Sequence, residues 1–241
     1  MRAETRHQLK QDRFSQVTID AAENAAHWSV EHKSKLMVAM AIILVAAVGV
    51  AGGWYYLNQQ DQKASLEMSQ AVRTLSTPVR PANMPAQPDE PSFASLKERA
   101  TAAHGQFQAI VDKYPHTHSA GFAAYFLGTT SADMGDNVAA ERELQNVISS
   151  GSNDLAALAK MALASVYRNT NRNKQAIDLY KQLAAKPAST VGKVTAQVEM
   201  AATYQADNQP LEAKRLYEQI AKENPATEAA QLASTKLQEL K

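Results

Sequence analysis

The sequence contains no cysteine among its 241 residues. This absence excludes disulfides, thiolate metal sites, a cysteine nucleophile and the lipidated cysteine of a bacterial lipoprotein. The chain also lacks an excess of charge, because 25 Lys and Arg face 24 Asp and Glu. Residues 1–35 hold six basic and five acidic residues, which leaves 19 of each in the rest of the chain. Without a long-range positive field we expect no nucleic-acid partner.

Motifs of enzyme active sites are lacking as well. There is no phosphate-binding loop, no nucleotide-binding glycine fingerprint and no His-Glu-x-x-His. His116 and His118 form a His-x-His pair after Pro115, a spacing that a metal could use, but no third ligand is evident and turn histidines are usually solvated. We therefore expect no enzymatic activity, no metal, no cofactor and no small-molecule substrate.

Charge is absent from residues 36–57, which read LMVAMAIILVAAVGVAGGWYYL. At about 1.5 Å per residue, such a segment crosses a hydrocarbon core of about 30 Å. Aromatic side chains at 54–56 lie at its C-terminal end, at the depth of the lipid headgroups, where such rings are enriched. The segment predicts a single transmembrane helix. A cleaved signal peptide is the alternative, but its apolar region is usually about 7–15 residues long, and apolar sequence here continues past Gly49 and Ala51.

The flanks of this segment predict its orientation. The 35 residues before it hold six Lys and Arg, and the 35 residues after it hold three, so the positive-inside rule favours a cytoplasmic tail at 1–35. Within the segment, Gly49 and Gly53 form a Gly-x-x-x-Gly motif that permits close packing of helices. The motif indicates a partner or self-association face, unless it reflects only the general abundance of glycine in membrane helices.

The rest of the chain has two parts. Residues 58–75 are good helix formers that we expect to continue as a stalk, and five prolines between 78 and 91 then predict a semi-extended linker. We therefore assign 58–91 to a stalk helix and linker. From residue 92 to 241 the pattern is helix, short turn, helix, without the alternation of strands, which predicts an all-α domain.

Within this domain, three segments repeat with offsets of 36 and 37 residues. In each unit, one small residue on each of two helices allows the helices to approach closely. The small residues of the first helices are Gly128, Ala164 and Ala201. Those of the second helices are Ala103, Ala140, Ala176 and Ala213. Seven positions after each small residue of the first helices is a residue type that tolerates the left-handed conformation that ends a helix. They are Gly135, Asn171 and Asn208.

This pattern resembles the tetratricopeptide repeat family. The resemblance rests on L-A-x-x-Y…A-x-x-x-Y from Leu163 and on M-A-x-x-Y…A-x-x-x-Y-x-x-I-x-x-x-x-P from Met200, with a weaker L-G…A-x-x-x-L from Leu127. The units are two or three residues longer than the usual 34, the first-helix Trp is missing, and Ser131 replaces an expected Tyr. The resemblance implies a solenoid of helical hairpins, with a C-terminal capping helix at about 227–240.

The same resemblance implies a groove, because the first helices line the concave face of such a stack. By analogy, the candidate partner-binding groove consists of Phe122, Tyr125, Leu158, Met161 and Val198. This surface is apolar and lacks the Lys/Asn pattern with which some family members hold a peptide carboxylate. It therefore fits a hydrophobic or amphipathic segment of another protein. Alternatively, the chain's own terminal helices cover these residues.

The layout of the whole chain is similar to the ancillary SecYEG translocon subunit family (YfgM-type proteins). A short charged tail, one membrane helix with aromatics after its Gly-rich end, and about three long repeats carry this resemblance over 36–241. It implies a bacterial inner-membrane protein with periplasmic repeats, which binds the SecYEG translocon, a periplasmic chaperone or prolyl-isomerase-like protein, and exported polypeptides. A general envelope scaffold for division, secretion or outer-membrane assembly is an open alternative, and a membrane-bound enzyme is another.

Overall fold

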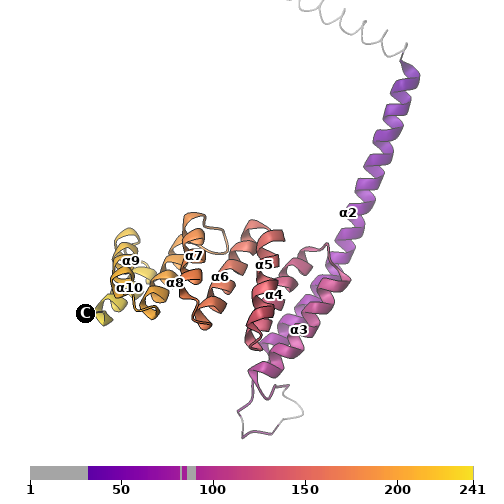
Figure 1. Cartoon of the computed structure of the whole chain (residues 1–241). Coiled ribbons are helices and arrows are strands. Elements are labelled where there is room, and N and C mark those ends of the chain that lie inside the picture. Colours follow the sequence, from indigo (N-terminus) through magenta and orange to yellow (C-terminus); the bar gives the residue numbers. More distant parts are fainter. Residues whose placement is uncertain (1–31, 82, 86–90, 241) are drawn as a thin grey trace, which may run out of the picture. The chain divides into compact units, whose positions relative to one another are not determined.

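The computed structural model describes residues 32–81, 83–85 and 91–240. The expected cytoplasmic tail lies almost wholly outside these residues, as do the linker residues Pro88, Asp89 and Glu90. The described part is all-α, as predicted, and an isolated bridge between Val79 and Phe93 is its one element of β pairing. Figure 1 shows the helices in chain order.

Nine helices make up the described part, and each one from α3 onward packs against the next. Their bounds are α2 (Lys33–Ser76), α3 (Leu96–Lys113), α4 (His118–Asp133), α5 (Asn137–Ser150), α6 (Asn153–Asn169), α7 (Asn173–Ala185), α8 (Lys193–Ala206), α9 (Pro210–Glu223) and α10 (Glu228–Glu239). The chain divides into two compact units, Met1–Tyr56 and Leu57–Lys241. The second unit holds the predicted repeats, so the predicted solenoid of helical hairpins is confirmed.

In the first unit, the described residues belong to the N-terminal part of α2. This helix is long and apolar enough to cross a membrane, judged by length and composition. The expected segment 36–57 lies inside it, and every side chain from Met37 to Leu57 is exposed. Apolar surface of that extent is uncommon on a soluble monomer. The exposure therefore distinguishes this segment from a buried core helix.

In the second unit, the small residues predicted at the helix contacts are buried. The six alanines of the set have no exposed surface, and Gly128 is also buried. A Cβ atom placed on Gly128 would lie 2.6 Å from Cγ of Leu144 and 3.2 Å from the backbone nitrogen of that residue. The α4 and α5 backbones can approach this closely only because position 128 has no side chain.

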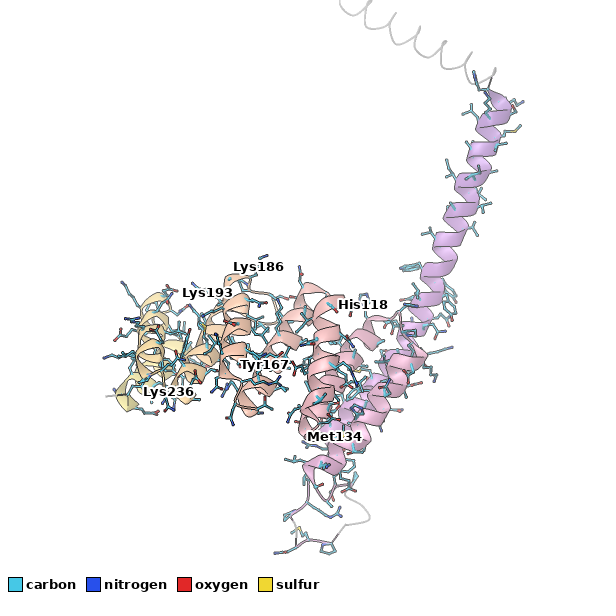
Figure 2. The ribbon with its side chains drawn as sticks, viewed as in Figure 1. His118, Met134, Tyr167, Lys186, Lys193 and Lys236 are labelled. Carbon is cyan, nitrogen blue, oxygen red and sulfur yellow. The ribbon has the colours of Figure 1, made fainter. Side chains whose placement is uncertain are left out.

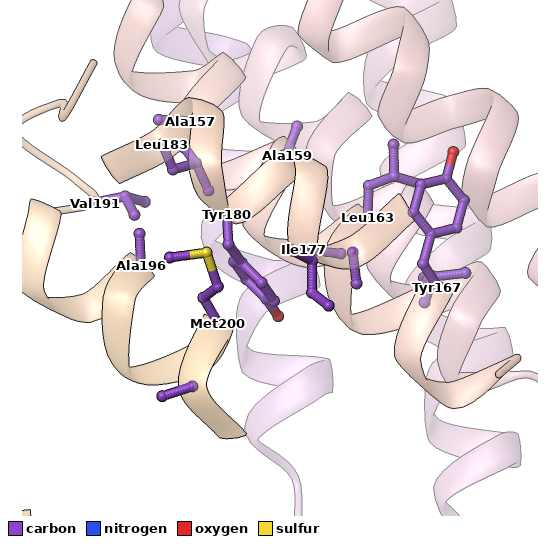
Figure 3. Close-up of a cluster of buried hydrophobic side chains, with 14 of the residues drawn as sticks. Ala157, Ala159, Leu163, Tyr167, Ile177, Tyr180, Leu183, Val191, Ala196 and Met200 are labelled. Carbon is purple, nitrogen blue, oxygen red and sulfur yellow. The ribbon is translucent and has the colours of Figure 1, made fainter. Parts of the chain in front are cut away.

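Larger side chains fill the space between these contacts. Tyr180 and Tyr217 are almost completely buried, at 1% exposure each, in a cluster that runs from α5 to α10. Figure 3 shows Leu163 and Tyr167 of α6 beside Ile177 and Tyr180 of α7, with Met200 of α8 on the other side of the Tyr180 ring. The repeats therefore share one continuous core, as expected of stacked hairpins.

The predicted left-handed turns are confirmed. Gly135, Asn171 and Asn208 have φ angles of 86°, 58° and 55°. In each turn the following backbone N–H donates to a carbonyl five residues earlier, as in a Schellman motif. These bonds are Asp136 N to Ser131 O at 2.9 Å, Arg172 N to Tyr167 O at 2.7 Å, and Gln209 N to Tyr204 O at 2.9 Å. The first helix of each unit thus ends in the same way.

The C-terminal helix lies where the sequence predicts it. Thr227 caps α10 by accepting a hydrogen bond from the backbone N–H of Ala230, at 3.2 Å. The helix packs against α9 and α8, and Ala233 on it has no exposed surface. One feature of this end was not predicted. Ala226, just before the helix begins, also has a positive φ, of 64°.

The N-terminal end of the stack differs from the expected arrangement. The stalk was expected outside the repeat domain, but Leu57–Ser76 lies in the same compact unit as the repeats. Ala64 and Ala71 of α2 have no exposed surface and share a core cluster with Phe107 and Ile110 of α3. The C-terminal part of α2 thus acts as the first helix of another hairpin, with the proline-rich segment as the connection to α3.

Two carboxylates of α2 reinforce this packing. Glu67 accepts hydrogen bonds from Lys113 Nζ at 2.6 Å and from the hydroxyl of Tyr114 at 2.8 Å. The bond from Lys113 is the main cause of a lowered Glu67 pKa. Asp61 accepts a bond of 3.0 Å from the backbone N–H of Ser119, in the first turn of α4. Asp61 thus supplies an acceptor to one of the free N–H groups at that helix end.

A pair of glycine substitutions tests the close contact. We expect Gly128→Ala to lower the free energy of unfolding by about 1–3 kcal/mol, because the added methyl group overlaps Leu144. Gly105→Ala in α3 is the matched control: its Cβ would meet nothing within 4 Å, and alanine should raise stability there by about 0.5–1 kcal/mol. Urea unfolding of residues 57–241 measures both. Equal effects would contradict the close contact.

Truncation tests the role of α2 in the core. A fragment of residues 92–241 lacks the helix that covers Phe107 and Ile110, so it should be less stable than a fragment of residues 57–241 by about 3 kcal/mol or more. It should also bind more of a dye that reports exposed apolar surface. Identical melting temperatures and dye binding would show that 57–76 is a stalk outside the core.

Candidate partner-binding groove

The first helices of the units form one side of the stack. Helix α4 contacts α6, and α8 contacts α10, in addition to the contacts of each helix with its chain neighbours. In the part of the chain that the structure describes, no comparable contact joins the second helices α3, α5, α7 and α9. At these two steps the first helices are therefore more closely spaced than the second helices, as on the inner face of a curved stack, and the ion pair between Arg168 and Glu199 joins α6 to α8.

Four of the five predicted groove residues lie half-buried on this layer. Tyr125 of α4, Leu158 and Met161 of α6, and Val198 of α8 all pack against the same core cluster. The surface part of each side chain remains accessible, so the row forms an apolar strip across three helices. Burial raises the pKa of the Tyr125 hydroxyl.

Phe122 differs from the other four. Its side chain is 46% exposed, and it belongs to neither core cluster. It lies one turn before Tyr125 on α4, and Tyr125 meets Phe126 edge to face with ring centroids 5.3 Å apart. Phe126 in turn stacks on Phe107 at 5.0 Å. Phe126 thus supports Tyr125, at the aromatic end of the strip, from the core side. The side chain of Phe122 is available at the surface.

The contribution of α10 to this face was not predicted. An open pocket with a volume of about 420 Å³ lies between α8 and α10. It is lined by Val194, Thr195, Val198, Glu199, Glu228, Ala229 and Leu232. A signal in the sequence was present: Ala123, Ala159, Ala196 and Ala233 recur at offsets of 36, 37 and 37 residues and have no exposed surface. This register places Leu232 of α10 at the position of Phe122, Leu158 and Thr195.

Polar contacts between units keep the inner helices in place. Glu141 of α5 accepts hydrogen bonds from Arg172 Nη1 at 2.6 Å and from the Tyr167 hydroxyl at 2.9 Å. The Arg172 guanidinium also lies over the Tyr167 ring, 4.4 Å from its centroid. Figure 2 shows Tyr167 in the middle of the stack. Arg168 of α6 forms an ion pair of 2.5 Å with Glu199 of α8. These bonds join neighbouring units to each other.

The remaining sequence candidates are isolated. In α2, a Cβ atom on Gly49 or Gly53 would meet nothing within 4 Å in the described chain, so these residues have no packing role there. Their role in helix association stays a prediction. His116 and His118 belong to no group of three possible metal ligands within the described residues. His104 lies 3.1 Å from Thr130 Oγ1, through its Nδ1.

Comparison with known proteins agrees with this architecture. A model of the tetratricopeptide repeat-like domain family matches residues 26–241. The chain belongs to this family. The match includes the apolar part of α2 as well as the repeats. Tetratricopeptide repeats generally mediate interactions between proteins, so the chain has the architecture of an interaction scaffold.

Two solved structures share the tetratricopeptide fold. One is a tetratricopeptide repeat protein from Parabacteroides merdae, with 15% identity, a TM-score of 0.52, and coverage of 74% of this chain and 60% of that one. The other holds the nearly identical repeats of a putative kinesin light chain of Podospora anserina, with 16% identity, a TM-score of 0.56, and coverage of 75% and 85%. At these identities the likeness concerns the fold alone. No curated protein matches the sequence.

The Glu141 contact predicts a dependence of stability on pH. Hydrogen bonding from Arg172 is the main cause of a lowered Glu141 pKa. The contribution of the ionised Glu141 carboxylate to the free energy of unfolding is therefore fully present above the ordinary pKa of 4.5, and it is lost as the pH falls through the lower pKa of the folded state. We expect Glu141→Gln to reduce the free energy of unfolding by about 1 kcal/mol at pH 7. The deficit should be smaller at about pH 3, because more of the carboxylate is then protonated in the folded protein.

Urea unfolding at both pH values measures the effect. Glu218→Gln, at an exposed position of α9, serves as the control and should change stability little at either pH. A deficit for Glu141→Gln that is the same at both pH values would mean that the ionised carboxylate contributes nothing.

Proposed function

We propose that this protein is a membrane-anchored, non-enzymatic scaffold whose inner helices hold apolar segments of other polypeptides. The observation that carries the proposal is the strip formed by Tyr125, Leu158, Met161 and Val198. These apolar side chains are held from behind by the core but are only half-buried. A helical or extended segment with apolar side chains would cover them and remove more apolar surface from water.

The anchor in this proposal is helix α2. Its N-terminal part has the length and composition of a membrane span, and its C-terminal part provides Ala64 and Ala71 to the core of the repeats. Helix α2 continues without a break through Gly49 and Ala51, where the sequence could resemble a cleavage site, and this continuity supports an uncleaved anchor. The excess of basic residues before the span supports a cytoplasmic N-terminus and repeats on the opposite side.

The more specific proposal is that the protein is an ancillary subunit of the SecYEG translocon in the bacterial inner membrane. It rests on the resemblance of layout described above and on the fit of an apolar groove to polypeptides that have not yet folded. In this role the groove receives exported polypeptides, and the repeats pass them to a periplasmic chaperone or prolyl-isomerase-like protein. Gly49 and Gly53 provide a close-packing face for a partner helix in the membrane.

Site-specific crosslinking tests the partner assignment. A photoreactive amino acid at Trp54, in the full-length protein in its native membrane, should crosslink to SecY. A second at Met161 should crosslink to exported polypeptides while they are being translocated. Capture at Trp54 of division, secretion or outer-membrane assembly proteins instead of SecY would replace the translocon role with that of a general envelope scaffold.

Substitution of groove residues tests the binding surface. We expect Tyr125→Gln combined with Met161→Gln to weaken capture of polypeptides about tenfold or more, because one apolar contact at the aromatic end of the strip and one on the next helix are lost. Leu96→Gln combined with Val138→Gln is the matched control, since these side chains are 61% and 80% exposed and lie outside the strip. The circular dichroism spectra of both variants should match the parent. Unchanged capture by the folded groove variant would refute the groove.

A further inference from the structure

The pocket between α8 and α10 has its own chemistry. Its apolar lining consists of Val194 and Val198 from α8 and of Ala229 and Leu232 from α10. Leu232 is 43% exposed, so a large apolar side chain is available to an incoming group. The volume of about 420 Å³ lies in the range of pockets that take small ligands or side chains.

Carboxylates are the charged groups that line this pocket. Glu199 of α8 and Glu228 of α10 belong to the lining, and the lining residues include no Lys, Arg or His. Arg168 pairs with Glu199 from the side of α6. Glu228 is exposed in the first turn of α10. An apolar surface therefore stands beside a net negative charge.

This end of the inner face differs from the opposite end. At positions related by the repeat offsets, α4 presents Phe122 and Tyr125, and α6 presents Leu158 and Met161. None of these four residues is Asp or Glu, whereas Glu199 of α8 and Glu228 of α10 line the pocket. The offsets align Glu228 with Asp154 of α6, but the Asp154 carboxylate accepts a hydrogen bond from the backbone N–H of Ser189, at 3.0 Å. The face is aromatic and uncharged at one end, and aliphatic and acidic at the other.

From this complementarity we infer that the α8–α10 pocket binds a polypeptide segment in which an apolar side chain is followed by lysine or arginine. The apolar side chain packs against Val198 and Leu232, and the adjacent cation pairs with Glu228. A segment with an acidic residue at the same place brings two like charges together and is disfavoured. The inference rests on the proposed groove, and it assigns that groove a preference for basic amphipathic segments.

The experiment compares three fluorescent peptides that share a Gly/Ser-rich frame and a central Phe-Leu pair. The two residues that follow this pair are both lysine in the first peptide, both glutamate in the second and both glutamine in the third. Binding to the full-length protein in lipid nanodiscs is measured by fluorescence anisotropy, with empty nanodiscs subtracted. We expect the lysine peptide to bind about threefold to fivefold more tightly than the glutamine peptide at low salt, and the glutamate peptide to bind most weakly. High salt should reduce these differences.

Variants assign the preference to the pocket. Glu228→Gln should remove most of the preference for lysine over glutamine, while Glu218→Gln on α9 should leave it unchanged. Leu232→Ser should weaken binding of all three peptides about fivefold or more, whereas Leu211→Ser, at a position that is 71% exposed on α9, should not.

The outcomes separate this inference from the groove itself. Equal binding of the three peptides, or a lysine preference that survives Glu228→Gln, overturns the inference, and so does the absence of binding of the lysine peptide. If binding is lost in the Tyr125/Met161 variant but retained in Leu232→Ser, the groove stands and the pocket does not take part. If the Tyr125/Met161 variant captures polypeptides normally while Glu228→Gln loses the lysine preference, the extended groove fails and the pocket stands alone.

Discussion

The close approach of paired helices at small residues is the constraint on which the rest of the repeat unit depends. At Gly128 the distance is so short that even a methyl group would overlap Leu144, and the alanines of the other pairs have no exposed surface. When backbones pack this closely, the large side chains must lie to either side of the contact. Tyr180 and Tyr217 therefore fill the spaces between hairpins, and their burial joins the units into one core. A stack with wider contacts would leave these rings partly in water.

This constraint also determines what the inner face can present. Each first helix directs its small residue toward its partner, and the residue three positions earlier lies beside it on the same side of the helix. Tyr125, Met161 and Val198 occupy this position, Leu158 lies one turn before Met161, and the core holds each of the four from one side only. The ion pair between Arg168 and Glu199, and the bonds of Glu141, then keep neighbouring units in register. The half-burial of the strip is thus a consequence of the repeat geometry.

The sequence was sufficient to predict much of this architecture because the repeat offsets and the turn residues are local signals. Gly135, Asn171 and Asn208 are types that tolerate a positive φ, and they have one. The role of α2 could not be predicted in the same way, because the proline-rich segment between Ser76 and Leu96 interrupts the 36–37 residue period. Its anchoring bonds through Asp61 and Glu67 join residues 46 to 58 positions apart, a separation that no local pattern reveals. The position of α10 could have been predicted, since Ala233 continues the alanine register. The acidic lining of the pocket could not, because Glu199 and Glu228 reach it from two different helices.

A repeat stack differs from a globular pocket in that its chemistry changes stepwise along the chain. Each unit offers one pair of inner positions in the same geometry, and the offsets fix their order as Phe122 and Tyr125, then Leu158 and Met161, then Thr195 and Val198, and finally Leu232 with Thr235. Because this order runs from aromatic to aliphatic and ends beside carboxylates, the inner face has a direction. A ligand whose own side chains vary along its length makes different contacts when it is reversed, so one orientation has the lower free energy. In the proposed groove, the small residues that set the helix spacing would therefore also allow the strip to distinguish the two ends of a bound segment, although none of them faces it.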